Sequence, residues 1–190
     1  MKIRRFGLIG FPLTHSFSKD YFTKKFKEEG IKDSVYQNFE IDKIEKFPKI
    51  LQKYGDLYGL NVTIPYKEKI IKYLDWVDDA VREIHAVNTI KILHKNEVGI
   101  SSLFGYNTDV YGFHDSLKPK LEKHHKRALV LGTGGAAKAV KFVLSKWLDI
   151  DFLFVSRNPG DTQTISYRGL NKDIIQNHQI IINTTPLGMY

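Results

Sequence analysis

Short apolar runs alternate with amphipathic segments along the 190-residue chain, which predicts strands alternating with helices. Between the runs, apolar side chains recur at helical spacing, as at Phe17, Tyr21 and Phe26. Pro48 lies inside one such segment and predicts a helix that starts late or kinks. We therefore predict an α/β fold, with strands over 3–10, 35–41, 57–64, 86–93, 98–104, 128–131, 152–155 and 180–182, and helices over 17–29, 44–51, 66–74, 78–84, 109–117, 136–148 and 170–176.

A charged, His-containing stretch at 122–126 predicts the boundary between two domains, 1–122 and 123–190. After it, the elements follow the βαβαβ order of a mononucleotide-binding half. The turn after the strand at 128–131 is rich in Gly: Gly132 permits a tight turn, and Gly134 lets the backbone approach a pyrophosphate. Ala137 is small enough for close helix–strand packing. The alternative is a tight turn that binds no ligand.

The end of the next strand distinguishes between the nicotinamide cofactors. NAD-binding proteins usually place an acid there for the ribose hydroxyls, whereas this chain continues Ser156-Arg157-Asn158. Arg157 is suited to clamp a 2′-phosphate, which favours NADP. An exposed surface arginine is the alternative. Asp161 follows nearby and cannot help to bind a phosphate, so NAD stays possible.

Polar residues also gather where the first strands end. Ser16 and Ser18 follow the first strand, and Thr63 and Lys67 follow the third; Asn88 and Asp109 flank the next two strands. Ligands of open α/β sheets bind outside the carboxyl ends of strands, so these groups are expected to converge. Together they suit a small polyhydroxylated acid, and a lysine beside a carboxylate suits proton transfer to a hydroxyl or carbonyl. Singly, the serines or Asp109 suit helix capping, and Lys67 suits a solvated first helical turn.

Composition narrows the classes of partner. Lys and Arg exceed Asp and Glu by 29 to 21, a net charge of +8 that suits anionic ligands. No helix-turn-helix or aromatic-interleaved basic patch predicts nucleic-acid binding. No apolar stretch is long enough to span a membrane, and no spacing suits a metal site. The absence of Cys excludes disulfides and is compatible with a reducing compartment.

Several motifs occur in one order: Ser16-x-Ser18, Asn61-Val-Thr-x-Pro-x-Lys67, Ala86-Val-Asn-Thr89, Asn107-Thr-Asp109, Gly132-x-Gly-Gly-Ala136 and Asn183-Thr-Thr-Pro-x-Gly-Met189. With them the chain resembles the shikimate dehydrogenase family over nearly its whole length. The resemblance implies a substrate domain with a mixed sheet, then a Rossmann-like domain. It also implies NADPH-dependent, reversible reduction of 3-dehydroshikimate to shikimate in cytoplasmic aromatic amino-acid (chorismate) biosynthesis, by a monomer or homodimer.

The resemblance also assigns roles to residues. Ser16 and Ser18 would hold the substrate carboxylate, and Lys67 would be the general acid–base, working with Asp109. Asn107 would order the site. Binding of the substrate hydroxyls would fall to Thr63, Asn88 and Asp109. The cofactor would be held by Gly132, Gly134, Gly135, Ala136, Ser156, Arg157, Asn183, Thr184 and Thr185.

The chain departs from the family pattern at its end. Family members continue beyond the motif at 183–189, and that continuation completes the nucleotide sheet. We therefore expect an incomplete second domain, an edge strand at 179–182 unpaired on one side, and weak activity of this chain alone. Two alternatives stay open: an NAD-using quinate/shikimate dehydrogenase, and a non-catalytic relative that only binds the ligand.

Overall fold

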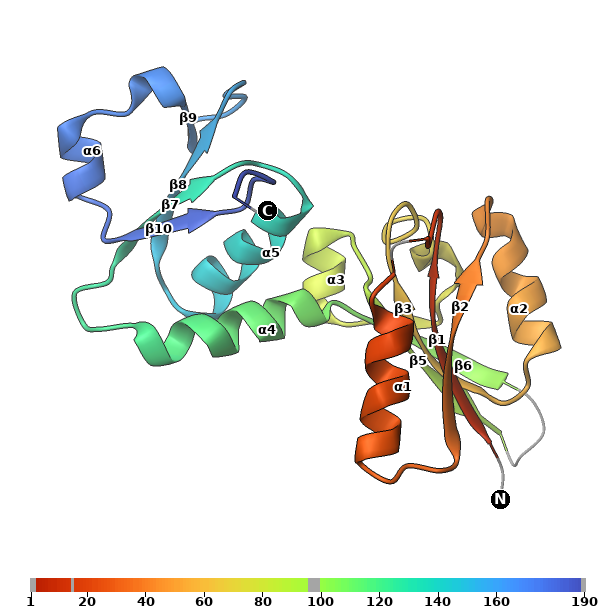
Figure 1. Ribbon diagram of the computed structural model, residues 1–190. Helices are drawn as coiled ribbons and strands as arrows, with labels where there is room; N and C mark the ends of the chain where they lie inside the picture. The colour runs from red at the N-terminus through yellow and green to blue at the C-terminus, as the bar shows by residue number, and fades with distance from the viewer. Residues whose placement is uncertain (1–2, 15, 96–99, 189–190) are drawn as a thin grey trace. The chain divides into compact units, whose positions relative to one another are not determined.

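The computed structural model describes residues 3–14, 16–95 and 100–188, and the chain forms two compact units, Met1–Asn107 and Thr108–Tyr190 (Figure 1). The boundary lies earlier than the predicted one at 122. The difference is helix α4 (Thr108–Leu117), which was expected to belong to the first domain. Its side chains Phe113 and Leu117 pack against the core of the second unit, so the helix folds with that unit.

In the described part of the first unit, six strands form one mixed sheet in the order β2-β1-β3-β5-β6-β4. Strands β2, β1 and β3 are parallel, β5 runs antiparallel to both β3 and β6, and β4 is parallel to β6. The predicted mixed α/β sheet is confirmed. The strands are β1 (Arg4–Gly10), β2 (Ser34–Glu40), β3 (Leu57–Val62), β4 (Trp76–Val77), β5 (Thr89–His94) and β6 (Ile100–Tyr106).

A helix packs on each face of this sheet. Successive side chains of a strand point to opposite sides, so each face offers apolar side chains to its helix. On one face, α1 (Ser18–Glu28) packs Phe22 and Phe26 against Leu8 and Tyr36. On the other, α2 (Phe47–Lys53) adds Phe47 to the larger core. A 3₁₀ turn, η1 (Ile44–Lys46), precedes α2, and Pro lies in the first turn of α2, so the predicted late start is confirmed.

The segment at 66–74 was predicted to be helical, and this was wrong. Only the 3₁₀ turn η2 (Ile71–Tyr73) forms there. Tyr66 is buried in the core, where its hydroxyl donates to the carbonyl of Ile41 at 2.6 Å. Toward the end of the segment, backbone hydrogen bonds join residues three apart and replace those of an α-helix. Two short strands, β4 and β9 (Thr164–Ser166), were also missed. The predicted strand at 98–104 falls partly outside the described residues, and β6 is described from Ile100 onward.

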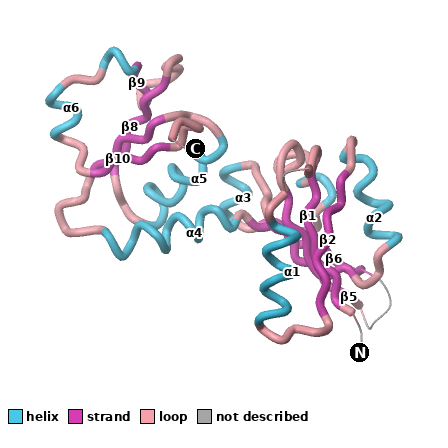
Figure 2. The backbone as a smooth tube through the Cα atoms, in the orientation of Figure 1, coloured by secondary structure: helices cyan, strands magenta, loops and turns pink. Residues whose placement is uncertain are grey.

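The second unit is a parallel sheet with the order β10-β7-β8-β9 (Figure 2). Counted along the unit this is fourth, first, second, third, the arrangement of a Rossmann half. Strand β10 pairs with β7 and has no second partner strand among the described residues. The elements are β7 (Arg127–Leu131), α5 (Gly135–Phe142), the π-helical η4 (Val143–Trp147), β8 (Asp151–Ser156), β9, η5 (Tyr167–Gly169), α6 (Lys172–Gln176) and β10 (Ile180–Asn183), after the 3₁₀ turn η3 (Lys118–Lys120).

Helix α3 (Asp79–Ile84) begins at a buried carboxylate. The Oδ1 atom of Asp78 accepts the backbone N–H of Val81 at 2.8 Å, so Asp78 is the N-cap. Burial raises the pKa of Asp78, while hydrogen bonds from the backbone N–H groups of Val81 and Asn107 act in the opposite direction. The neighbouring Asp79 is exposed and pairs with Arg82 at 3.2 Å. The two adjacent acids therefore differ in structural role.

We expect Asp78→Ala to lower the free energy of unfolding by about 1–2 kcal/mol, since it removes the N-cap. Asp79→Ala should change it by less than about 0.5 kcal/mol, because exposed ion pairs contribute little. Urea unfolding of both variants beside the wild type measures the difference. Equal losses of stability in the two variants would contradict the assignment.

Candidate functional site

The carboxyl ends of β1 and β3 meet at one edge of the first sheet. The backbone N–H of Thr63 donates to the carbonyl of Ile9 at 3.0 Å, and that of Phe11 to Ile64 at 3.1 Å. Only a residue without a Cβ fits at Gly10, because that atom would lie 2.4 Å from Cγ2 of Thr63. The loops after β1 and β3 are therefore held side by side.

The start of β5 and the end of β6 reach the same edge. The N–H of Val62 donates to the carbonyl of Asn88 at 2.8 Å, and the N–H of Asn88 donates to Tyr106 at 3.0 Å. The side-chain amide of Asn107, which is 2% exposed, donates to the carbonyl of Ala86 at 2.9 Å. The turn that carries Asn88 is thus fixed from both sides.

The loop after β1, which carries Ser16 and leads to Ser18, is called the serine loop. It lines a pocket of about 300 Å³ at this edge of the sheet. Glu40 holds the loop by accepting the N–H of Leu13 at 3.1 Å. The pocket brings Ser16, Ser18 and Thr63 together. It is lined by Leu8, Pro12, Leu13, Thr14, Ser16, Phe17, Ser18 and Thr63.

Neither serine caps helix α1. The N-cap is Phe17, with no side-chain capping bond, so the capping alternative does not apply. The hydroxyl of Ser16 is buried and has no hydrogen-bond partner among the described residues. A buried, unpaired hydroxyl is costly in free energy, which is offset when a ligand supplies the missing partner. This hydroxyl suits an anionic acceptor such as a carboxylate.

Lys67 lies in the turn after β3, not in a helix. Tyr66, the residue before Lys67, is held in place by its buried ring. The carbonyl of Lys67 accepts the N–H of Val87 at 2.8 Å. The backbone of Lys67 is therefore tied to the turn that carries Asn88. Its side chain is partly buried, unlike that of a fully solvated surface lysine.

Asp109 belongs to the second unit, where it lies exposed in the first turn of α4. The helix begins at Thr108, so Asp109 is not its N-cap. A negative charge in a first helical turn is favoured by the helix dipole. The five other predicted substrate-binding residues, Ser16, Ser18, Thr63, Lys67 and Asn88, all lie in the first unit.

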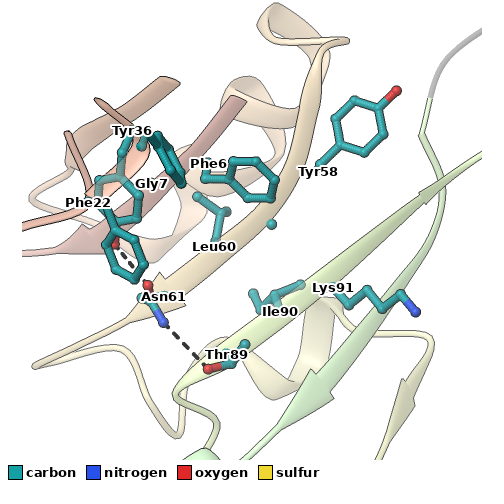
Figure 3. A pocket seen from close by; sticks show the side chains of 12 residues that line it. Phe6, Gly7, Phe22, Tyr36, Tyr58, Leu60, Asn61, Thr89, Ile90 and Lys91 are labelled. Carbon is teal, nitrogen blue, oxygen red and sulfur yellow. Dashed lines mark hydrogen bonds between the residues drawn. The ribbon is translucent and has the colours of Figure 1, made fainter. Parts of the chain in front are cut away.

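Three residues adjoining this site were missed from the sequence. The hydroxyl of Tyr36 donates to Oδ1 of Asn61 at 2.8 Å, and the amide of Asn61 donates to Oγ1 of Thr89 at 3.5 Å (Figure 3). Asn61 stands two residues before Thr63 and therefore projects to the same side of the chain, a signal that was available. The partnership with Tyr36 joins distant segments and has no local signature.

In the second unit, the ends of β7 and β10 are joined at the point where the strand order reverses. The N–H and hydroxyl of Thr184 both donate to the carbonyl of Leu131, at 2.9 and 2.6 Å. Gly132 has φ +101°, and a Cβ there would lie 2.9 Å from Oγ1 of Thr184. Such a reversal point is where doubly wound sheets bind nucleotides.

The N-terminus of α5 fits a pyrophosphate. Its N-cap, Gly134, makes no side-chain capping bond, and the first turn contains no acid. A Cβ built at Gly134 or Gly135 meets nothing within 4 Å, so the space beside the backbone amides is open. Ala136 is exposed in the first turn, whereas Ala137 is 1% exposed and packs in the core. The open amides suit an anion.

The end of β8 places Ser156 and the exposed Arg157 one strand away from this helix terminus. Ser156 accepts the N–H of Asn158 at 3.3 Å. Asp161 is occupied by its own turn, because its Oδ1 atom accepts the hydroxyl of Thr164 at 2.6 Å. Arg157 is thus the charged group at the strand end itself.

The loop after β10 is held by Asn183. Its Oδ1 atom accepts both the N–H and the hydroxyl of Thr185, at 2.9 and 2.7 Å, and its amide donates to the carbonyl of Leu187 at 2.8 Å. Asn183 and Thr185 therefore shape the loop, while Thr184 ties it to β7.

Residues 3–14, 16–95 and 100–188 contain no group of three His, Asp or Glu side chains placed to hold a metal ion. Within the same ranges, no helix has the length and apolar character needed to cross a membrane.

Comparisons with known proteins agree with this geometry. A family model described as the shikimate dehydrogenase substrate binding domain matches residues 8–90. The shikimate dehydrogenase (NADP(+)) of Pyrococcus abyssi is 36% identical over 97% of this chain and 69% of its own length.

Two solved structures are similar over both units. The Thermus thermophilus shikimate 5-dehydrogenase, in complex with NADP(H) and shikimate, has a TM-score of 0.73 and 28% identity over 96% of this chain and 69% of its own. The Listeria monocytogenes enzyme, in complex with shikimate and NAD, has a TM-score of 0.79 and 26% identity over 98% and 70%. The chain belongs to the shikimate dehydrogenase family.

Proposed function

We propose that this chain is an NADP-dependent oxidoreductase that interconverts shikimate and 3-dehydroshikimate. The observation that carries the proposal is the edge of the first sheet, where Ser16 shares a pocket with Ser18 and Thr63 and its buried hydroxyl has no hydrogen-bond partner within the described part of the chain. The names of its relatives and the Rossmann order of the second unit support the same activity.

Shikimate is a carboxylic acid with several ring hydroxyls, and the site offers complementary groups. Ser16 and Ser18 bind the carboxylate, since hydroxyls donate well to an anion. Thr63, Asn88 and Asp109 bind the ring hydroxyls. Amide and hydroxyl side chains each contain both a donor and an acceptor. They therefore suit the hydroxyl groups of the ring, which also donate and accept.

Lys67 carries the proton in this proposal. In the direction of oxidation, its neutral amine takes the proton of the substrate hydroxyl, and in reduction the ammonium returns it to the carbonyl oxygen. Bound NADP supplies the hydride acceptor. Asp109 is assigned to work with Lys67 in this step.

The second unit binds the cofactor. The amides around Gly132, Gly134, Gly135 and Ala136 hold the pyrophosphate, and Asn183, Thr184 and Thr185 shape the loop on the nicotinamide side. Ser156 and Arg157 take the 2′-phosphate, which distinguishes NADP from NAD. The second candidate function is an NAD-dependent dehydrogenase that also oxidises quinate. The similar Listeria monocytogenes structure, which contains shikimate and NAD, supports NAD as the cofactor in this candidate.

A cytoplasmic location and a monomeric or homodimeric state belong to the same proposal. The absence of Cys is compatible with a reducing compartment. The proposal includes no metal and no nucleic-acid partner.

Oxidation of shikimate, followed by absorbance of the reduced cofactor, is expected to be faster with NADP than with NAD at equal concentrations. Arg157→Ala should raise the KM for NADP about tenfold and leave that for NAD unchanged, because only NADP carries the 2′-phosphate. Arg168→Ala, another exposed arginine of the same unit, is the control. A clear preference for NAD in the wild type would overturn the assignment of Arg157, and no turnover with either cofactor would overturn the proposed activity.

Lys67→Ala is expected to lower kcat by about 10²–10⁴, the usual contribution of a positioned acid–base group. Its Kd for shikimate should change less than about fivefold, since other groups bind the carboxylate and hydroxyls. Lys69→Ala removes an exposed lysine two residues away and should leave both quantities near the wild-type values. Steady-state kinetics and calorimetric titration measure them. Near-normal turnover of Lys67→Ala would exclude Lys67 as the proton carrier.

A further inference from the structure

Tyr36 occupies a position on β2 that no motif of the sequence marks. Its ring stacks on Phe22 with centroids 4.6 Å apart and planes 14° from parallel, and the residue is 7% exposed. The ring lines an apolar pocket of about 330 Å³ together with Phe6 and Leu60 (Figure 3). A phenol buried among such side chains needs a partner for its hydroxyl.

One polar side chain provides that partner. The hydroxyl of Tyr36 donates to Oδ1 of Asn61 at 2.8 Å. A phenol has one hydrogen to donate, and Tyr36 gives it to Asn61. The amide oxygen of Asn61 is therefore held toward Tyr36.

The hydrogen bonds continue across the sheet. The amide of Asn61 donates to Oγ1 of Thr89 at 3.5 Å, and Thr89 donates to Oδ1 of Asn88 at 3.1 Å. Donation therefore runs in one direction, from Tyr36 through Asn61 and Thr89 to Asn88. Figure 3 shows the first two of these bonds, which bridge β2, β3 and β5. The line ends at Asn88, to which the proposed function gives a substrate contact.

We propose that Tyr36 is a positioning residue that orients Asn88, through Asn61 and Thr89, for substrate binding. The inference rests on the proposed function. Groups held in their binding orientation before the ligand arrives lose less conformational freedom on binding, which strengthens affinity. Burial raises the pKa of Tyr36 to about 12, so the hydroxyl keeps its hydrogen at ordinary assay pH.

Tyr36→Phe removes the hydroxyl and keeps the stacked ring. It should raise the KM and Kd for shikimate about tenfold, with kcat within about threefold of the wild type and the Kd for NADP unchanged. Tyr58→Phe is the matched control, because Tyr58 lines the same pocket and takes no part in this line of bonds. It should leave the Kd for shikimate unchanged. Thermal unfolding of each variant, with binding measured well below its midpoint, separates positioning from loss of fold.

A double-mutant cycle tests whether Tyr36 acts through Asn88. In an Asn88→Ala background, Tyr36→Phe should raise the Kd for shikimate by clearly less than tenfold. Thr89→Val interrupts the line beyond Asn61 and should weaken shikimate binding without affecting NADP, which gives a second measure if Tyr36→Phe folds poorly.

The outcomes separate the two proposals. If the wild type binds and oxidises shikimate while Tyr36→Phe binds it equally well, the role of Tyr36 is overturned and the proposed function stands. Additive effects of Tyr36→Phe and Asn88→Ala, or an unchanged Kd in Thr89→Val, would also overturn the positioning role. A wild type that neither binds nor oxidises shikimate overturns both.

Discussion

The closeness of β1 and β3 at their carboxyl ends is the constraint on which the first unit depends. The contact leaves no room for a Cβ at Gly10, and backbone hydrogen bonds donated by Thr63 to Ile9 and by Phe11 to Ile64 hold the loops together. Because these bonds involve main-chain atoms, the loop positions do not depend on flexible side chains. The serine pocket and the turn that carries Lys67 are consequences of this one approach.

The same kind of constraint recurs in the second unit. Gly132 adopts a positive φ and lies against Thr184, whose hydroxyl and N–H both bond to the end of β7. In each unit a glycine at a strand end allows a neighbouring loop to approach, and in each unit the polar groups assigned to ligand binding flank that glycine. The positions at which the fold requires glycine therefore indicate where a ligand can approach the backbone.

Periodicity and glycine positions were sufficient to predict most strands and the Rossmann half, since these signals are local, whereas the mixed sheet was predicted from the family resemblance. The helix predicted at 66–74 did not form, because Tyr66 is buried and donates to the carbonyl of Ile41. Helix α4 groups with the second unit because Phe113 and Leu117 pack against its core, and no local pattern indicates which core these side chains join. The hydrogen bond between Tyr36 and Asn61 could not be predicted from local sequence, since the two residues lie on different strands and meet only when the sheet forms.

The serine motif illustrates how the structure refines a sequence pattern. As a motif, Ser16 and Ser18 are equivalent hydroxyls that bind one carboxylate. In the fold their hydroxyls differ: that of Ser16 is buried with no hydrogen-bond partner among the described residues, whereas Ser18 interacts with Tyr36 and acts against the rise in the pKa of its phenol. An ionised carboxylate has no hydrogen to donate, so each serine must donate to it. Ser18 must give up its interaction with Tyr36 to do so. The two serines thus contribute unequally, since an unpaired hydroxyl gains a whole hydrogen bond on binding and a paired one gains only a difference.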